Sequence, residues 1–172
     1  MKNLKQLIAT LFILASLVFG MTGCDKAKAL TTVRQADELS AKLLIYGRNI
    51  ALANNESFAR GNIPAAVHLT TNKAVDTYLK GVDAFLAGIV AAKKAIAAGS
   101  NASGQVDILK ALFDREVVAA ALALVNSVTA LPPGLAGQIG GWLAAIQLAI
   151  SSFRVLFADA QISLNTEVQH YA

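Results

Sequence analysis

Apolar residues recur every three or four positions along most of this chain, and this helical period constrains its fold more than any other feature. No stretch alternates apolar and polar residues over the length of a β-strand. The period predicts four helices separated by segments rich in Gly, Pro, Asn and Ser, at residues 29–54, 70–98, 105–130 and 135–164. The chain is therefore expected to be all-α.

Each predicted helix places its apolar residues on one face. These faces comprise, in chain order, Leu39, Leu43, Tyr46, Ile50 and Ala53; Val75, Tyr78, Val82, Phe85, Ile89, Ala92 and Ile96; Val106, Leu109, Phe113, Val117, Ala120, Leu124 and Val128; and Leu135, Ile139, Trp142, Ile146, Ala149, Phe153, Phe157 and Ala160. Asp76 and Lys80 are spaced to form an ion pair on the outside of the second helix. Long amphipathic helices with shorter connections predict one antiparallel four-helix bundle of up-down topology.

The first residues have the composition of an export signal. Lys2 and Lys5 precede an uncharged run from Leu7 to Gly20. A helix of about 14 residues rises roughly 21 Å, which is short of the ~30 Å hydrocarbon core of a bilayer. The segment is therefore predicted to be a signal helix that is cleaved from the bundle, rather than a stable membrane span.

Met21-Thr22-Gly23-Cys24 follows this run, and Cys24 is the only cysteine of the chain. The tetrapeptide resembles the lipobox of bacterial lipoproteins, in which an aliphatic residue and two small residues precede an invariant cysteine. The resemblance implies that the Cys24 thiol is diacylglycerated, that the signal is cut before Cys24, and that the new N-terminus is acylated, with chains such as palmitate. Two or three chains would anchor the protein stably, because each buried CH₂ contributes about 0.8 kcal/mol.

These features predict a signal peptide at 1–23, a lipidated tether at 24–29, a bundle at 30–165 and a frayed C-terminus at 166–172. The expected location is the bacterial cell envelope, with the bundle facing the periplasm or the exterior. Asp25 resembles the residue that retains lipoproteins in the inner membrane of enteric bacteria, so it mildly favours the inner membrane. The choice between the inner and outer membrane stays open.

Charge and motifs exclude several classes of function. The formal net charge is only +4, and it includes Lys2 and Lys5 of the signal, so no nucleic-acid surface is expected. No P-loop, dinucleotide-binding glycine motif or nucleophile elbow is present. His68 and His170 are far apart in the sequence, and lipidation accounts for the single cysteine. We therefore predict a protein that is not an enzyme and has no cofactor, metal ion or small-molecule substrate.

Residues 117–153 contain no ionisable side chain. Within them Gly137 and Gly141 form a G-x-x-x-G motif, which can mark close helix–helix contact. The segment is either a hairpin that inserts into a membrane or one end of a bundle that a second protein covers. Polar residues such as Asn126 and Gln147, together with the one-sided apolar face, favour the covered bundle.

The leading hypothesis is a lipid-anchored helical bundle that serves as a protein-interaction or structural module of the envelope, through a partner protein or self-association. Phe58, Arg60 and Trp142 are candidate partner-binding residues because aromatic and Arg side chains anchor interfaces, and Ala145 is a candidate on the uncharged outer face. Two alternatives stay open. One is a membrane-active lysis or pore-forming protein that inserts the 117–153 hairpin, and the other is an exclusion or immunity lipoprotein of a mobile element.

Overall fold

The computed structural model describes the backbone of residues 2–128 and 131–169, and the side chains of residues 25–128 and 131–160. Its elements are the helices α1 (Lys2–Ala59), α2 (Ala65–Ala97), α3 (Ala102–Leu112), η1 (Phe113–Val118, a π-helical segment), α4 (Ala119–Val128) and α5 (Pro133–Gln169). No strand occurs over the described backbone. The predicted all-α class is confirmed.

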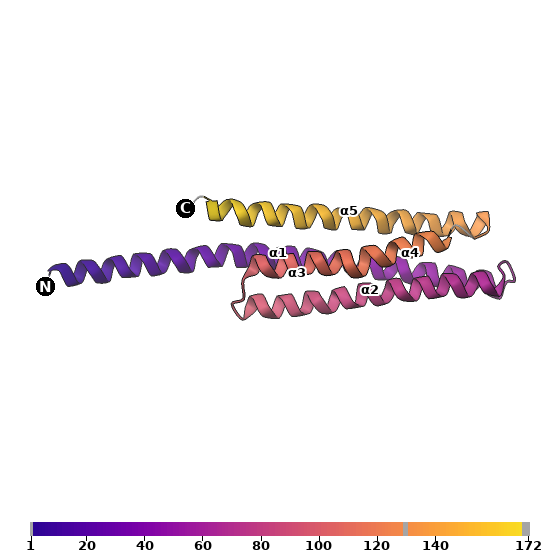
Figure 1. Ribbon diagram of the computed structural model, residues 1–172, viewed down its shortest axis with the longest axis horizontal. Coiled ribbons are helices and arrows are strands. Elements are labelled where there is room, and N and C mark those ends of the chain that lie inside the picture. The colour runs from indigo at the N-terminus through magenta and orange to yellow at the C-terminus, as the bar shows by residue number, and fades with distance from the viewer. Residues whose placement is uncertain (1, 129–130, 170–172) are drawn as a thin grey trace.

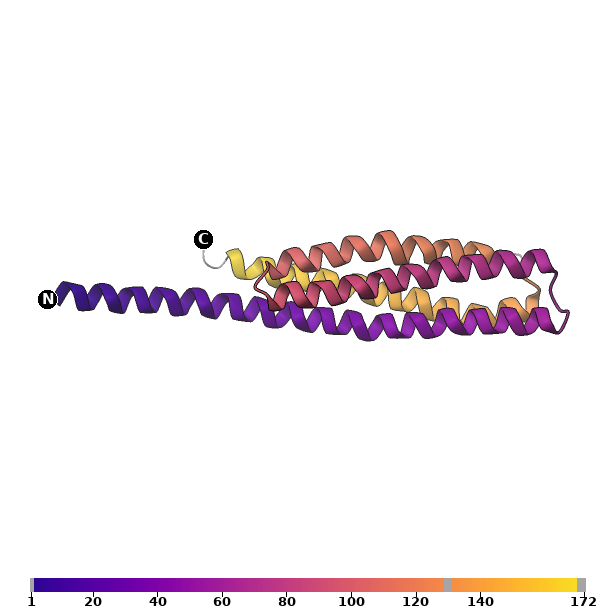
Figure 2. The same cartoon turned by 90° about the horizontal axis from the view of Figure 1, so that it is seen from below.

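The long helices run side by side along one axis (Figures 1 and 2). Because α3, η1 and α4 follow one another without a break, they form one long helical segment. α2 packs against α1 and against this segment, and α1 also packs against α5. The turn at 60–64 and the start of α5 lie at one end of the molecule, and the loop at 98–101 lies at the other (Figure 1).

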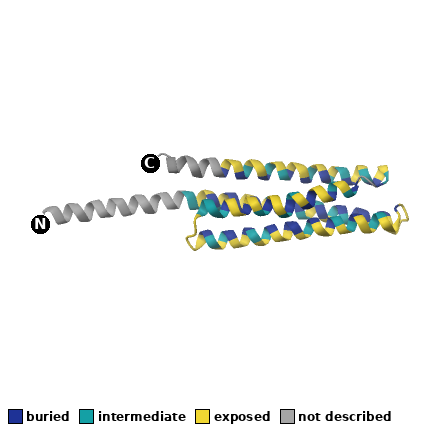
Figure 3. Ribbon diagram, viewed as in Figure 1, coloured by how far each residue is buried: buried dark blue, intermediate teal, exposed yellow. Residues whose placement is uncertain are grey.

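The core lies between these helices, and buried positions recur along each of them (Figure 3). The predicted apolar faces of the second and third helices are completely buried. The predicted face of the fourth is buried except at Trp142, where the neighbouring Leu143 is buried instead. At the centre, four rings from α2, η1 and α5 form a cluster of edge-to-face, tilted and stacked contacts, with centroids 4.3–6.1 Å apart: Phe85, Phe113, Phe153 and Phe157.

Two helix ends differ from the sequence prediction. The first helix was expected to end at Asn54-Asn55, but α1 continues to Ala59, and α2 begins at Ala65 rather than at residue 70. Asn54 is a poor helix former in isolation because its amide competes for backbone hydrogen bonds. In the folded chain that amide is completely buried and bonded to α2 instead, so tertiary contacts override the local preference. The tether predicted at 24–29 is also helical, as part of α1.

Left-handed glycines end α1 and α2 in the same way. Gly61 has φ +72°, and the amides of Gly61 and Asn62 donate to the carbonyls of Phe58 (2.9 Å) and Ser57 (2.9 Å). Gly99, with φ +91°, ends α2 with the same pair of bonds. This is the Schellman arrangement, which requires the positive φ that glycine adopts without strain. In α1 it holds Asn62 over the last turn of the helix.

Close approach between helices depends on two further glycines. At Gly47 of α1, an added Cβ would lie 2.7 Å from Leu79 Cδ2 and 2.8 Å from Tyr78 Cε1. At Gly81 of α2, it would collide with the backbone carbonyl of Glu116 in η1. Both positions therefore exclude side chains. The π-helical segment opposite Gly81 was not predicted, because one wider turn changes the apolar spacing too little to be seen in the sequence.

Polar contacts fix α1 against α2 along their length. The buried Tyr78 hydroxyl donates to the Leu43 carbonyl (3.2 Å), and burial raises the pKa of the phenol well above its usual value, so it stays protonated and continues to donate. Lys93 Nζ lies 2.5 Å from Asp37 Oδ2. Lys26 Nζ donates to the Ala97 carbonyl (3.2 Å) at the C-terminal end of α2, where a cation is favourable.

Candidate functional site

A groove separates α4 and η1 from α5, which touch along much less of their length than α1 and α5 do. It consists of two adjoining cavities, of about 530 Å³ and 250 Å³, that share Val118 and Arg154. The larger cavity is also lined by Lys110, Phe113, Asp114 and Phe157. The smaller is also lined by Ala121, Leu122, Val125, Ile146, Gln147, Ile150 and Ser151. We call these two cavities together the α4–α5 groove.

The groove is apolar along its floor and carries charge at one end only. Lys110, Asp114 and Arg154 line the larger cavity. Of the residues that line the smaller cavity, Arg154 is charged and the others are uncharged. From Lys110 to Val125 one wall extends about 22 Å, at 1.5 Å per residue. A groove of this length matches about four turns of a docked helix, and its uncharged wall, from Val118 to Val125, matches about two of them.

The two helices that border the groove, α4 and α5, also carry exposed, uncharged residues. Leu122 of α4 is 61% exposed and Leu148 of α5 is 70% exposed. A Cβ added at Gly137 or Gly141 would meet no atom within 4 Å among the described residues. The G-x-x-x-G motif therefore forms no close helix–helix contact within this part of the chain, and its glycines add to an open, uncharged face.

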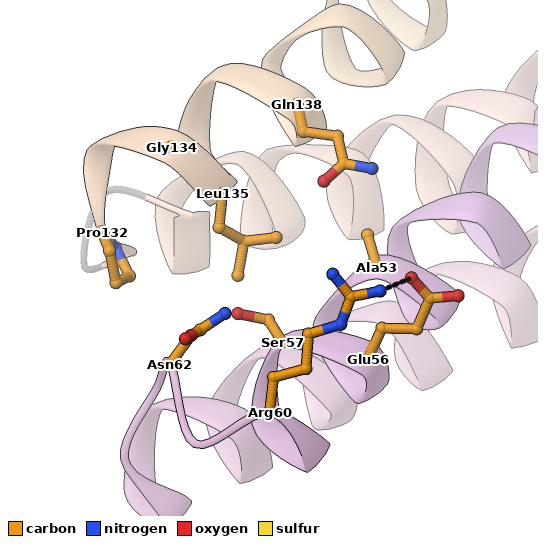
Figure 4. A pocket seen from close by; sticks show the side chains of 9 residues that line it. All are labelled: Ala53, Glu56, Ser57, Arg60, Asn62, Pro132, Gly134, Leu135 and Gln138. Carbon is orange, nitrogen blue, oxygen red and sulfur yellow. Dashed lines mark ion pairs between the residues drawn. The ribbon is translucent and has the colours of Figure 1, made fainter.

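A separate cavity lies at the end of the molecule where α1 ends and α5 begins (Figure 4). We call it the end pocket. It has a volume of about 340 Å³, and polar side chains from α1, the 60–64 turn and α5 converge on it. These are Glu56, Ser57, Arg60, Asn62 and Gln138.

Beside the end pocket, a network of amides joins α1 to α2. Asn54 Nδ2 donates to the His68 carbonyl (3.1 Å) and to Asn72 Oδ1 (2.8 Å), and it lies 3.2 Å from His68 Nδ1. Asn72 Nδ2 donates to Asn55 Oδ1 (3.0 Å). The His68 ring stacks on Phe58, with centroids 4.2 Å apart and planes 10° apart. His68 is thus held between an amide and an aromatic ring.

The structure separates the residues that the sequence nominated for partner binding. Arg60 lines the end pocket, whereas Phe58 covers His68. Trp142 packs against the core from α5, and Ala145 is half-buried on the same helix. Neither lines the groove. The Cys24 side chain lies outside the described residues, as does His170.

Sequence reasoning missed most residues of the α4–α5 groove and of the end pocket. The missing charges of 117–153 were a signal for the groove, but they could not show that Leu122 and Ile150 face each other across it. No pattern connected Ser57, Asn62 and Gln138, which three separate elements bring together. No group of three or more His, Cys, Asp and Glu side chains suited to a metal ion occurs among the side chains described at 25–128 and 131–160.

One stretch within the described side chains, Pro133–Ala160 of α5, is long and apolar enough to cross a membrane by length and composition. Only 28% of its most apolar window is buried. Amphipathic helices of helical bundles reach the same length and composition. No protein-family model, curated protein or solved structure matches this chain.

Proposed function

We propose that this chain is a lipid-anchored, non-enzymatic module of the bacterial cell envelope that binds a partner protein through the α4–α5 groove. The observation that carries the proposal is an apolar groove with uncharged, exposed flanks on the surface of the described residues. A solvated helix face usually carries many charges, and an exposed apolar patch of this kind marks an interaction site.

The proposed partner contributes an apolar helix. The groove is about four turns long, with an uncharged wall from Val118 to Val125 and with Asp114 and Arg154 at the other end to pair with polar or charged groups. Trp142, Phe58, Arg60 and Ala145 would lie outside this contact, because none of them lines the groove. Self-association through the same groove is a second way to supply the helix.

The proposed architecture is an antiparallel, up-down four-helix bundle in which α1, α2, the α3–η1–α4 segment and α5 are the four rods. The contacts of α2 with both of its sequence neighbours, and of α1 with α5, support this arrangement. In it, the lipidated N-terminus and the 98–101 loop would share the membrane-proximal end. The start of α5 would lie far from the membrane.

Leu122→Glu should reduce partner binding at least tenfold and change the free energy of unfolding by less than about 0.5 kcal/mol. Leu122 is 61% exposed, so glutamate can stay solvated in the free protein, but a bound helix would bury its charge. Crosslinking in cells followed by identification of the captured protein measures the loss. Leu69→Glu on α2 is the matched control, because Leu69 is 65% exposed and lines neither cavity of the groove. Equal capture by both variants would rule out the groove.

Cys24→Ser should abolish lipidation and signal cleavage, and the protein should accumulate in its uncut form. The serine hydroxyl is a much weaker nucleophile than a thiolate and does not accept the diacylglyceryl group at a lipobox cysteine. Metabolic labelling with a fatty acid, together with the electrophoretic mobility of the chain, measures both effects. Unchanged labelling and processing in this variant would refute the anchor.

Residues 117–153 provide the competing function, insertion of a hairpin into the membrane. The apolar stretch Pro133–Ala160 favours it, whereas Arg154 and Asp159 lie within that stretch and oppose it. A chain expressed from residue 25 should be soluble and helical if the bundle proposal holds. Retention of that chain in membranes after an alkaline wash would favour insertion instead.

A further inference from the structure

The outer side of α1 carries a stripe of residues in which two exposed apolar side chains lie between charged ones. Successive members of the stripe are three or four residues apart, so all of them lie on one face of the helix. We call it the α1 stripe: Glu38, Lys42, Ile45, Asn49, Leu52, Glu56 and Arg60. Ile45 is 54% exposed and Leu52 is 57% exposed, so the middle of the stripe is apolar and uncovered.

Helix α5 widens this apolar face. The charged residues at both ends of the stripe line cavities together with residues of α5, so α5 lies along the stripe. Val155, which lines one of these cavities, is 59% exposed, and Leu148, two turns earlier on the same side of α5, is 70% exposed. Exposed aliphatic side chains from two neighbouring helices, bordered by charges, indicate an interaction surface.

The charges of the stripe indicate which partner fits it, because they are complementary to themselves. Lys42 lies seven residues before Asn49, and Glu56 lies seven residues after it. Glu38 and Arg60 lie eleven residues before and after the same position. If a second α1 crosses the stripe in the antiparallel direction, with Asn49 at the two-fold axis, each cation meets an anion. These pairs would lie about 10 Å and about 16 Å from the axis.

The apolar side chains of the stripe follow the same symmetry. Ile45 lies four residues before Asn49 and Leu52 lies three residues after it, so Ile45 of each copy would pack on Leu52 of the other. A parallel pair in register would instead place Glu38 against Glu38 and Lys42 against Lys42, which is unfavourable. The order of charges therefore favours the antiparallel pair.

Within one copy, the charges of the stripe are held only weakly. Its two ion pairs join positions i and i+4 of α1 between exposed side chains, at 3.8 Å and 3.9 Å, and such pairs contribute little to stability. Lys42 makes no ion pair within the part of the chain whose side chains are described. Arg48 lies outside the stripe, and its exposed side chain can turn away from the same residue of a second copy.

We propose that a second copy of this chain docks on the α1 stripe, antiparallel and about a two-fold axis at Asn49, and forms a homodimer. Leu148 and Val155 of α5 would add to the apolar area at the edge of this contact. The N-termini of the two copies would lie at opposite ends of the dimer, so anchored copies would pair between facing membranes. This surface is separate from the α4–α5 groove, and the dimer depends neither on the groove nor on the anchor.

Sedimentation equilibrium of the full-length lipoprotein in neutral detergent measures this association, and the parent chain should be a dimer. Lys42→Glu and Glu56→Lys should each weaken the dimer at least tenfold, because each places like charges together at two symmetrical points. The double variant should restore the affinity to within about threefold of the parent, because it exchanges the two charges and keeps every pair opposite in sign.

Two controls separate this dimer from other effects. Lys73→Glu changes an exposed lysine of α2 outside the stripe and should leave the dimer unchanged. Leu122→Glu in the α4–α5 groove should also leave it unchanged, so failure of the dimer and failure of the groove are measured separately.

Asn49→Cys tests the position of the axis, because a residue on a two-fold axis lies beside itself in the second copy. A short bismaleimide should link two copies of this variant. Asp83→Cys, on the exposed side of α2, is the matched control and should not be linked beyond the parent level. A monomeric parent, a dimer that keeps its affinity in Lys42→Glu, a double variant that stays monomeric, or equal crosslinking at both positions would overturn the proposal.

Discussion

Gly81→Ala should destabilise the folded chain by about 2 kcal/mol. Alanine is the better helix former by about 1 kcal/mol, so a gain would be expected at an ordinary helical position. At Gly81, however, the new Cβ would collide with the backbone carbonyl of Glu116, which cannot rotate away as a side chain can. Forcing α2 and η1 apart would loosen the Phe85–Phe113 contact beside them. Urea unfolding followed by circular dichroism measures the difference.

Gly137→Ala is the matched control, because it makes the same change in a helix where nothing lies within 4 Å of the new Cβ. It should stabilise the chain by about 0.5–1 kcal/mol. The effect of Gly88→Ala on the free energy of unfolding should lie between these two values. The new Cβ would meet the end of the Leu112 side chain, which is flexible and can move away. If Gly81→Ala and Gly137→Ala were equally stabilising, α2 and η1 could not pack as closely as described.

Asn54→Asp should have a larger effect, a loss of about 3–5 kcal/mol at neutral pH. Asn54 is completely buried, and its amide nitrogen donates to the His68 carbonyl and to Asn72 Oδ1. A carboxylate at this position would direct an anionic oxygen at these acceptors, and the His68 imidazole, whose Nδ1 lies 3.2 Å from Asn54 Nδ2, is the only ionisable group among the hydrogen-bond partners described for this side chain. The introduced carboxyl would therefore have a raised pKa in the folded state.

The pH dependence follows from that shift. The folded variant would bind its proton more tightly than the unfolded chain, in which the carboxyl titrates near 3.9. Stability of the variant should therefore fall as the pH rises above about 4, relative to the parent chain. Asn55→Asp is the control, because Asn55 is exposed and uses its side-chain oxygen as an acceptor, which aspartate retains. The Asn55→Asp substitution should lower the free energy of unfolding by less than about 0.5 kcal/mol. Equal losses in both variants would show that Asn54 is not buried among acceptors.

The candidate sites were only partly predictable from the sequence. The absence of charge at 117–153 indicated a surface that needs a partner, which stays a prediction. The structure adds that Leu122 and Leu148 of this segment are exposed. Arg60 was nominated as an anchor and does line a cavity. Ser57 and Gln138 could not be nominated, because they lie far apart in the sequence and neither belongs to a motif. Their proximity depends on how α5 packs on α1.

Helix ends show the same division. Gly61 and Gly99 marked the turns correctly, because a left-handed residue is a local requirement. Asn54 was assigned to a helix end for an equally local reason, and the assignment was wrong. Its amide donates to His68 and Asn72 across the interface with α2, and such tertiary partners cannot be predicted from the local sequence.

The sequence by itself determined that the chain is helical and which residues of α2, α3, η1 and α4 face inward. Burial of one face repeats with the helix turn, so it can be predicted from each segment separately. The tertiary structure alone decided that Gly81 meets a carbonyl, that Asn54 is buried, and that a groove and a pocket lined by polar side chains form beside α5. These features depend on the distances between helices, which are set by the packing of all the side chains between them.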